Sequence, residues 1–200
     1  MNLFITFEGL DGAGKSTQSR LLKEYFENKN IPSVSVFEPG STDLGNLLRD
    51  ILKNSVNIDP IAETYLFATA RSQLTREIIE PALKQGKIVI CDRFIHSSFA
   101  YQGAARGLTI PLVERINECA VSVWPDITFF INTSVEESMT RKQKRGELPD
   151  RIEEESITFR KNAYLAYRQM VKEGKMIEIN GHDTVENIHK CIVKYIEVRL

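Results

Sequence analysis

The sequence predicts an α/β fold in which a five-stranded parallel sheet carries helices on both faces. Short apolar runs, rich in β-branched and aromatic residues, alternate with long segments of helical periodicity. A glycine-rich pattern joins the first apolar run to the first helical segment. The chain has 200 residues, 42% of them hydrophobic, which suffices for one full core. We therefore expect a single domain over residues 1–200.

The expected strands are the five apolar runs at residues 3–7, 34–37, 88–91, 127–131 and 176–179. The expected helices lie between and after them, at residues 14–28, 44–54, 61–85, 110–120, 135–144, 153–173 and 185–198. Helical crossovers between successive strands make the strands parallel. Ligand sites of such sheets lie at the carboxyl ends of the strands. No internal repeat and no linker rich in Gly, Ser or Pro divides the chain.

Composition favours a soluble protein that acts on small molecules. The 26 basic and 27 acidic side chains nearly cancel, so no global field favours nucleic acid or an anionic membrane. Cys91, Cys119 and Cys191 form no CxxC pair, which suits a reducing compartment. No basic leader precedes the first apolar run, and no charge-free stretch approaches about 20 residues. We expect a cytoplasmic location.

The first functional motif spans residues 9–17 and matches the phosphate-binding pattern GxxxxGK[ST]. Glycines let the backbone bend so that its N–H groups point at phosphate oxygens, and Lys15 adds a positive charge. Ser16 is expected to hold the Mg²⁺ that accompanies a nucleoside triphosphate. Average residue usage gives such a match by chance in about one chain per hundred of this length, but the flanking strand and helix argue against chance. The residues expected to bind ATP are Gly9, Leu10, Asp11, Gly12, Ala13, Gly14, Lys15, Ser16 and Thr17.

A second motif, Asp92-Arg93, ends the strand expected at residues 88–91. In P-loop enzymes an aspartate at the end of a neighbouring strand holds the metal ion, directly or through water. Arg93 is suited to fork onto a second phosphate. The alternative for Asp92-Arg93 is an exposed ion pair at a strand end. Because this motif occurs together with the phosphate-binding motif, we favour a catalytic role for Lys15, Asp92 and Arg93.

Five segments in this order resemble the thymidylate kinase family over nearly the whole chain. They are residues 7–18, 38–40, 92–94, 98–103 and 145–153. The resemblance implies the P-loop fold of nucleoside monophosphate kinases. It also implies phosphorylation of dTMP to dTDP by ATP with Mg²⁺, a step towards dTTP, and a homodimer.

The resemblance divides the positive charges of the site among three places. Lys15 serves ATP, and Arg93 and Arg49 clamp the monophosphate. A basic segment at about 141–154 resembles the mobile lid of the family. The phosphate loop has no basic residue before Lys15, so a cation must come from elsewhere, and Arg145 and Arg151 are the best candidates. The alternative for this segment is a solvated helix face.

Recognition of the base and the sugar is implied in the same way. Phe67 resembles the platform that stacks on thymine, and Arg71, on the same helix face, resembles its donor to the base. For Phe67 alone, core packing is the alternative. Glu38 contacts the metal ion or the phosphates, or else braces its loop. Contacts to the base edge and the deoxyribose are implied for Asp11, Ser98, Tyr101 and Gln102.

Three positions depart from the family pattern. Phe37 stands where the family usually has arginine before Glu-Pro-Gly, Phe94 replaces the common tyrosine after Asp-Arg, and Pro149 lies within the lid motif. Two other functions stay open from the residues alone. One is a kinase of the same fold acting on dUMP, dCMP or a deoxynucleoside. The other is a nucleotide-dependent switch that transfers no phosphoryl group to a small molecule.

Overall fold

The computed structural model describes residues 2–55, 57–145 and 155–199 of the chain. Its five strands are β1 (Phe4–Glu8), β2 (Ser33–Phe37), β3 (Ile88–Asp92), β4 (Ile127–Asn132) and β5 (Ile177–Asn180). They form one sheet in the order β2-β3-β1-β4-β5, and every neighbouring pair is parallel. The predicted five-stranded parallel sheet is confirmed.

The helical elements connect successive strands as crossovers, except for the last one, which follows β5. They are α1 (Lys15–Asn28), α2 (Asp43–Asn54), α3 (Pro60–Leu74), η1 (Thr75–Ile79), α4 (Glu80–Lys84), α5 (Ile95–Ser98), η2 (Phe99–Ala105), α6 (Ile110–Asn117), α7 (Val135–Arg145), α8 (Ile157–Lys172) and α9 (Val185–Glu197). The two η segments have the wider turns of a π-helix.

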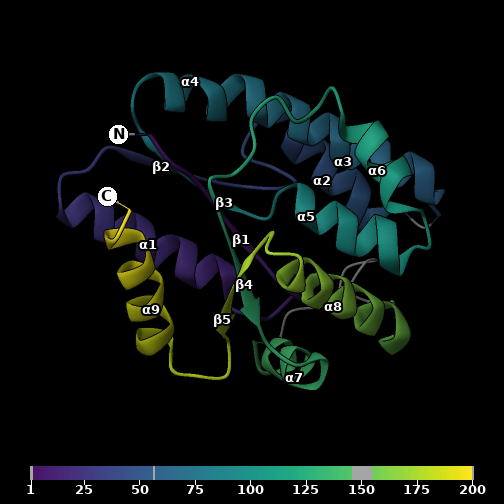
Figure 1. The fold of residues 1–200 in the computed structure, drawn as a ribbon. Helices are drawn as coiled ribbons and strands as arrows, with labels where there is room; N and C mark the ends of the chain where they lie inside the picture. The colour runs from purple at the N-terminus through teal and green to yellow at the C-terminus, as the bar shows by residue number, and fades with distance from the viewer. Residues whose placement is uncertain (1, 56, 146–154, 200) are drawn as a thin grey trace.

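Helices cover both faces of the sheet (Figure 1). On one face, Leu22 and Phe26 of α1 and Ile192 of α9 pack in a core with Ile5 and Phe129 of the strands. The core on the other face joins β1 and β3 to α3, α8 and the helical elements that follow β3. Because helices cover both faces, the central strands β3, β1 and β4 are buried along nearly their whole length, whereas the edge strands β2 and β5 alternate polar and apolar residues.

The helical prediction differs from the structure in two places. The helix expected at 61–85 is α3, η1 and α4 in succession, because a π-helical segment interrupts the α-helical turns. No helix was predicted between residues 95 and 105, where α5 and η2 lie. Most of their residues are buried between α8, α6 and α3, so the segment lacks the one-sided apolar pattern of a surface helix.

The sheet register brings polar residues together at the carboxyl edge. Phe7 of β1 and Phe37 of β2 both pair with Asp92 of β3, so the loops after these three strands start side by side. The site is built at this edge, as the rule for open parallel sheets predicts. Among the helices of the described residues, none is long and apolar enough to cross a lipid bilayer.

Candidate active site

The phosphate loop connects β1 to α1. Gly9, Gly12 and Gly14 have φ values of 142°, 87° and 102°, which L side chains rarely adopt. The N–H of Ala13 donates to the carbonyl of Leu10 at 3.2 Å, which closes the turn that leads into α1. The amino end of α1 therefore faces the centre of the loop, where backbone N–H groups attract anions.

Close packing also requires glycine in this loop. A Cβ at Gly9 would lie 2.8 Å from the carbonyl oxygen of Ile131 in β4. A Cβ at Gly12 would collide with the carbonyl oxygen of Ser138 in α7. The loop is thus held between β4 and α7, which limits its motion around a bound phosphate chain.

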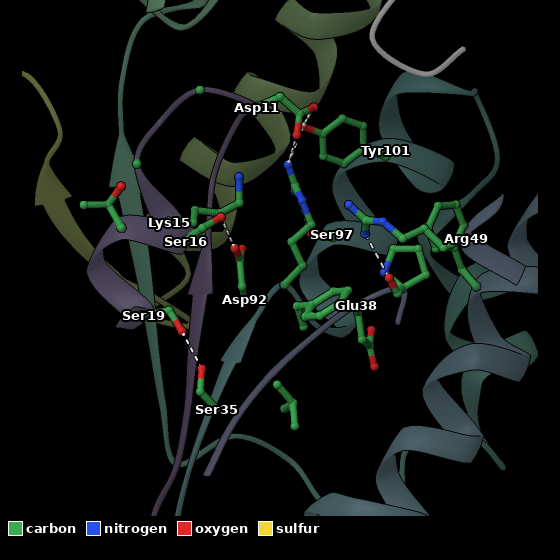
Figure 2. A pocket seen from close by; sticks show the side chains of 18 of the residues that line it. Asp11, Lys15, Ser16, Ser19, Ser35, Glu38, Arg49, Asp92, Ser97 and Tyr101 are labelled. Carbon is green, nitrogen blue, oxygen red and sulfur yellow. Dashed lines mark hydrogen bonds and ion pairs between the residues drawn. The ribbon is translucent and has the colours of Figure 1, made fainter. Parts of the chain in front are cut away.

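Lys15, Ser16 and Asp92 lie close together at the start of α1 (Figure 2). The ammonium of Lys15 donates to the carbonyl of Leu10 at 2.9 Å. Burial and the nearby charge of Arg93 together lower the pKa of Lys15 to about 8, against the opposing effect of Asp92, Asp11 and Glu8. The hydroxyl of Ser16 donates to Oδ2 of Asp92 at 2.5 Å. Oδ1 of Asp92 is buried, and no hydrogen bond from the described residues reaches it. This pair of oxygen-bearing side chains fits a hard divalent cation beside a triphosphate.

Arg93 faces Asp11 of the phosphate loop. Its guanidinium lies 2.5 Å from Oδ1 of Asp11, and its plane approaches the ring of Tyr101, 5.1 Å from the ring centroid. Burial acts to raise the pKa of Asp11, but Arg93, Lys15 and Lys142 outweigh it and hold that pKa well below its usual range. Asp11 is therefore ionised and balances part of the positive charge of the site.

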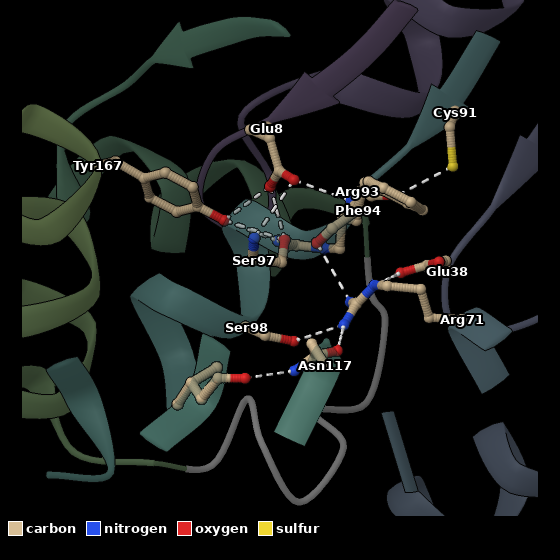
Figure 3. Close-up of polar contacts among 11 residues, drawn as sticks. Glu8, Glu38, Arg71, Cys91, Arg93, Phe94, Ser97, Ser98, Asn117 and Tyr167 are labelled. Atoms are coloured by element: carbon tan, nitrogen blue, oxygen red, sulfur yellow. Dashed lines mark hydrogen bonds and ion pairs between the residues drawn. The ribbon is translucent and has the colours of Figure 1, made fainter. Parts of the chain in front are cut away.

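Glu8 of β1 positions Arg93 through two hydroxyl groups. Glu8 was not predicted from the sequence as a residue of the site. Oε2 of Glu8 accepts hydrogen bonds from Ser97 at 2.6 Å and from Tyr167 at 2.9 Å, and both hydroxyls also accept from Arg93 (Figure 3). Burial raises the pKa of Glu8, although Arg93 and these hydrogen bonds oppose the shift. The sequence did contain a signal for this role, because Glu8 ends a mostly apolar strand. A carboxylate buried there needs hydrogen-bond donors around it.

Arg71 of α3 is buried behind the residues that line the site, and its guanidinium contacts several elements (Figure 3). Its guanidinium pairs with Glu38 at 2.8 Å and donates to Ser98 at 3.1 Å, Asn117 at 2.6 Å and the carbonyl of Phe94 at 3.3 Å. Burial raises the pKa of Glu38 to about 7, with Arg71 opposing the shift. Arg71 thus ties the end of β2 to α3, α5 and α6.

These groups surround a cleft of about 640 Å³ at the carboxyl edge of the sheet (Figure 2). The predicted site residues that line it are Asp11, Gly12, Gly14, Lys15, Ser16, Thr17, Glu38, Arg49, Phe67, Asp92, Arg93, Ser98, Tyr101 and Gln102. The described residues Gly9, Leu10, Ala13 and Arg71 were also predicted, but they do not line the cleft. Ser97 and Lys142 line it and were not predicted as site residues.

The part of the cleft away from the phosphate loop is more apolar. Phe67 of α3 is half-buried there. Arg49 of α2 donates to the carbonyl of Pro39 at 2.9 Å and stacks on Phe37, with 5.3 Å between the guanidinium carbon and the ring centroid. Gln102 donates to Glu63 at 2.9 Å. An aromatic ring beside fixed polar groups is suited to a planar base.

The basic segment predicted at 141–154 is only partly described. Arg141 in α7 pairs with Glu137 at 2.5 Å and donates to the carbonyl of Gly181 at 2.8 Å, so it joins α7 to the loop before α9. Arg145 ends α7, but its side chain lies outside the described part of the chain, as does Arg151. The departure at Pro149 lies outside it as well.

The chain resembles thymidylate kinases in sequence and in structure. A family model described as thymidylate kinase matches residues 7–192. The thymidylate kinase of Fervidobacterium nodosum is 44% identical over 194 residues, with 96% of this chain and 97% of the relative covered. That of Thermoanaerobacter sp. is 42% identical over 198 residues, with 97% of each covered. The crystal structure of the Ehrlichia chaffeensis thymidylate kinase matches with a TM-score of 0.81 at 32% identity, over 98% of both chains.

These matches extend over almost the whole chain, so they include both sequence motifs, the sheet and the residues that line the cleft. The chain belongs to the thymidylate kinase family, the phosphotransferases that phosphorylate dTMP to dTDP with ATP.

Proposed function

We propose that this cleft transfers the γ-phosphoryl group of ATP to the 5′-phosphate of dTMP. The observation that carries the proposal is that one cleft is lined by both Lys15, the first residue of α1, and Arg93, which directly follows β3. A phosphoryl transfer between two anions needs positioning and positive charge rather than covalent chemistry by the protein. The attacking phosphate oxygen is already anionic, so no general base is required.

The donor phosphates are proposed to occupy the phosphate loop, with Lys15 on their oxygens and the N–H groups of residues 12–17 around them. Ser16 and Asp92 would hold Mg²⁺, for which the buried free oxygen of Asp92 and its neighbouring hydroxyl provide suitable ligands. Bound there, Mg²⁺ would neutralise charge on the triphosphate.

The acceptor is proposed to occupy the opposite half of the cleft. Arg93 and Arg49 clamp its phosphate, and Phe67 stacks on thymine. Ser98, Tyr101 and Gln102 face the base edge and the deoxyribose, and Asp11 faces the 3′-hydroxyl. Arg71 is proposed to act on the base, and its hydrogen bonds to Ser98 and Glu38 also hold this wall in place. Arg145 and Arg151 are proposed to complete the charge on the transferring group.

We further propose a homodimer that packs through α2 and α3. These two helices contact each other and expose a set of large apolar side chains, none of which lines the cleft. The set consists of Leu44, Leu47, Ile51, Ile61 and Tyr65. Contiguous exposed apolar surface of this kind is typical of protein interfaces.

The function is tested by coupled ADP release with MgATP and a panel of acceptors. We expect dTMP to be the fastest acceptor, ahead of dUMP, dCMP and thymidine. Faster turnover of dCMP or thymidine would assign the chain to another acceptor. Equal ADP release with and without any acceptor would instead support a nucleotide-dependent switch.

Replacing the cations of the cleft should remove turnover. Lys15→Ala and Arg93→Ala should each lower kcat at least 100-fold, since each loses charge stabilisation of about 3 kcal/mol or more. Arg199→Ala removes a charge at the exposed carboxyl end of the chain and should change kcat little. Thermal unfolding of each variant checks that it is folded. Near-normal rates for either cleft variant would contradict the assigned role.

Removing the aromatic platform should affect dTMP alone. Phe67→Ala should weaken dTMP binding by about 10-fold or more, because base stacking contributes about 1–3 kcal/mol. The affinity for ATP, measured on the same variant by calorimetry, serves as the control and should stay unchanged. Unchanged dTMP affinity would show that Phe67 only packs the helix.

The dimer is tested by light scattering on the purified protein. We expect the mass of two chains for the parent and of one chain for Leu47→Asp, because an aspartate there would be buried without a partner. Leu165→Asp is the matched control, since Leu165 on α8 is 62% exposed and Leu47 is 63% exposed. A parent protein with the mass of one chain would contradict the proposal.

A further inference from the structure

Lys142 of α7 is a buried cation in the wall of the catalytic cleft. Its residue exposure is only 8%, although it lies in the basic segment for which a solvated helix face is the alternative prediction. It lines the cleft together with Asp11, Gly12 and Lys15 of the phosphate loop. Its neighbour Arg141 is directed elsewhere, to Glu137 and the carbonyl of Gly181. The basic side chains of α7 are therefore not equivalent.

The stem of Lys142 lies over Gly12. A Cβ built on Gly12 would lie 3.1 Å from Cγ of Lys142, and it would also collide with the carbonyl oxygen of Ser138, one turn earlier in α7. A side chain at position 12 therefore has no room. The space into which it would project is crossed by a lysine stem from another element.

The charge of Lys142 acts on the phosphate loop. Lys142 is one of the cations that lower the pKa of Asp11, after Arg93 and Lys15. Burying an ammonium group is costly unless anionic groups face it. Asp11 is one such group beside Lys142, and the phosphate chains of two nucleotides would bring further anions into the same cleft, whose loop carries no basic residue before Lys15.

We propose that Lys142 is a catalytic residue of this kinase and that its ammonium group contacts the transferring phosphoryl group. Lys142 thereby supplies from α7 a positive charge that the loop cannot supply at position 12, where no side chain fits. The inference rests on the function proposed above. In the transfer, the bond between the γ-phosphorus and the oxygen bridging it to the β-phosphorus breaks, and its electron pair stays on ADP. A new bond forms from an oxygen of the dTMP phosphate to the same phosphorus. Lys142 keeps its proton throughout and donates hydrogen bonds to the equatorial oxygens.

Lys142→Met keeps the length of the stem and removes the charge. We expect kcat to fall about 100-fold, within the range for loss of one preorganised donor, while KM for dTMP changes less than about threefold. Lys142→Arg restores a cation and should stay within about 10-fold of the parent. The matched control is Lys84→Met on α4, where the lysine side chain is 78% exposed and far from the cleft. It should leave kcat unchanged.

A binding measurement separates this role from a structural one. The ternary mixture of dTMP, ADP and aluminium fluoride with Mg²⁺ mimics the transferring group, so Lys142→Met should weaken its binding at least 10-fold more than that of ADP alone. If Lys142→Met does not bind dTMP, Lys142→Gln is measured in its place, with the same loss of kcat expected. A kcat within about threefold of the parent would overturn the proposal, whether or not stability falls. Failure of the parent to phosphorylate dTMP would instead overturn the proposed function.

Discussion

The ion pair between Arg93 and Asp11 is the contact on which the site depends. Asp11 belongs to the loop after β1 and Arg93 follows β3, so their 2.5 Å contact joins the phosphate loop to the segment after β3. Arg93 adopts a φ of 71°, which is unfavourable for a residue with a side chain and is maintained here by its surroundings. The register of the strands makes this contact possible. β1 and β3 are neighbours in the sheet, and Phe7 of β1 pairs with Asp92 of β3, so the loops after both strands begin side by side.

Two buried carboxylates, those of Glu8 and Glu38, hold the arginines of the site in place. Glu8 contacts Arg93 through the hydroxyls of Ser97 and Tyr167, and Glu38 contacts Arg71 directly. Such buried pairs contribute little net stability, because desolvation of the charges offsets their attraction. Their benefit is preorganisation: the positive charges are fixed before the substrates arrive, so little reorganisation is needed during the reaction.

The parts of the site that are local in sequence were predictable, and the parts assembled from distant segments were not. The phosphate loop and Asp92-Arg93 follow apolar strands, so pattern and topology place them together. Glu8 was missed because its partner Tyr167 lies 159 residues away. Arg71 was expected at the base, yet its donors meet Asn117 and Ser98, which α6 and the unpredicted α5 bring to it. Helical periodicity does not reveal α5 and η2, because they are buried on most sides.

The loop after β2 shows how the protein tolerates a departure from the family pattern. The family resemblance leads us to expect arginine at position 37, but this chain has Phe37, whose ring stacks on Arg49; Arg49 also donates to the carbonyl of Pro39. A guanidinium held by a ring and a carbonyl loses less side-chain freedom when it binds a phosphate than an unrestrained one does. We therefore expect the fixed guanidinium of Arg49 to offset, in part, the absence of a basic side chain at position 37. The same reasoning applies at Gly12, where a lysine anchored on a helix faces the position at which the loop has no side chain.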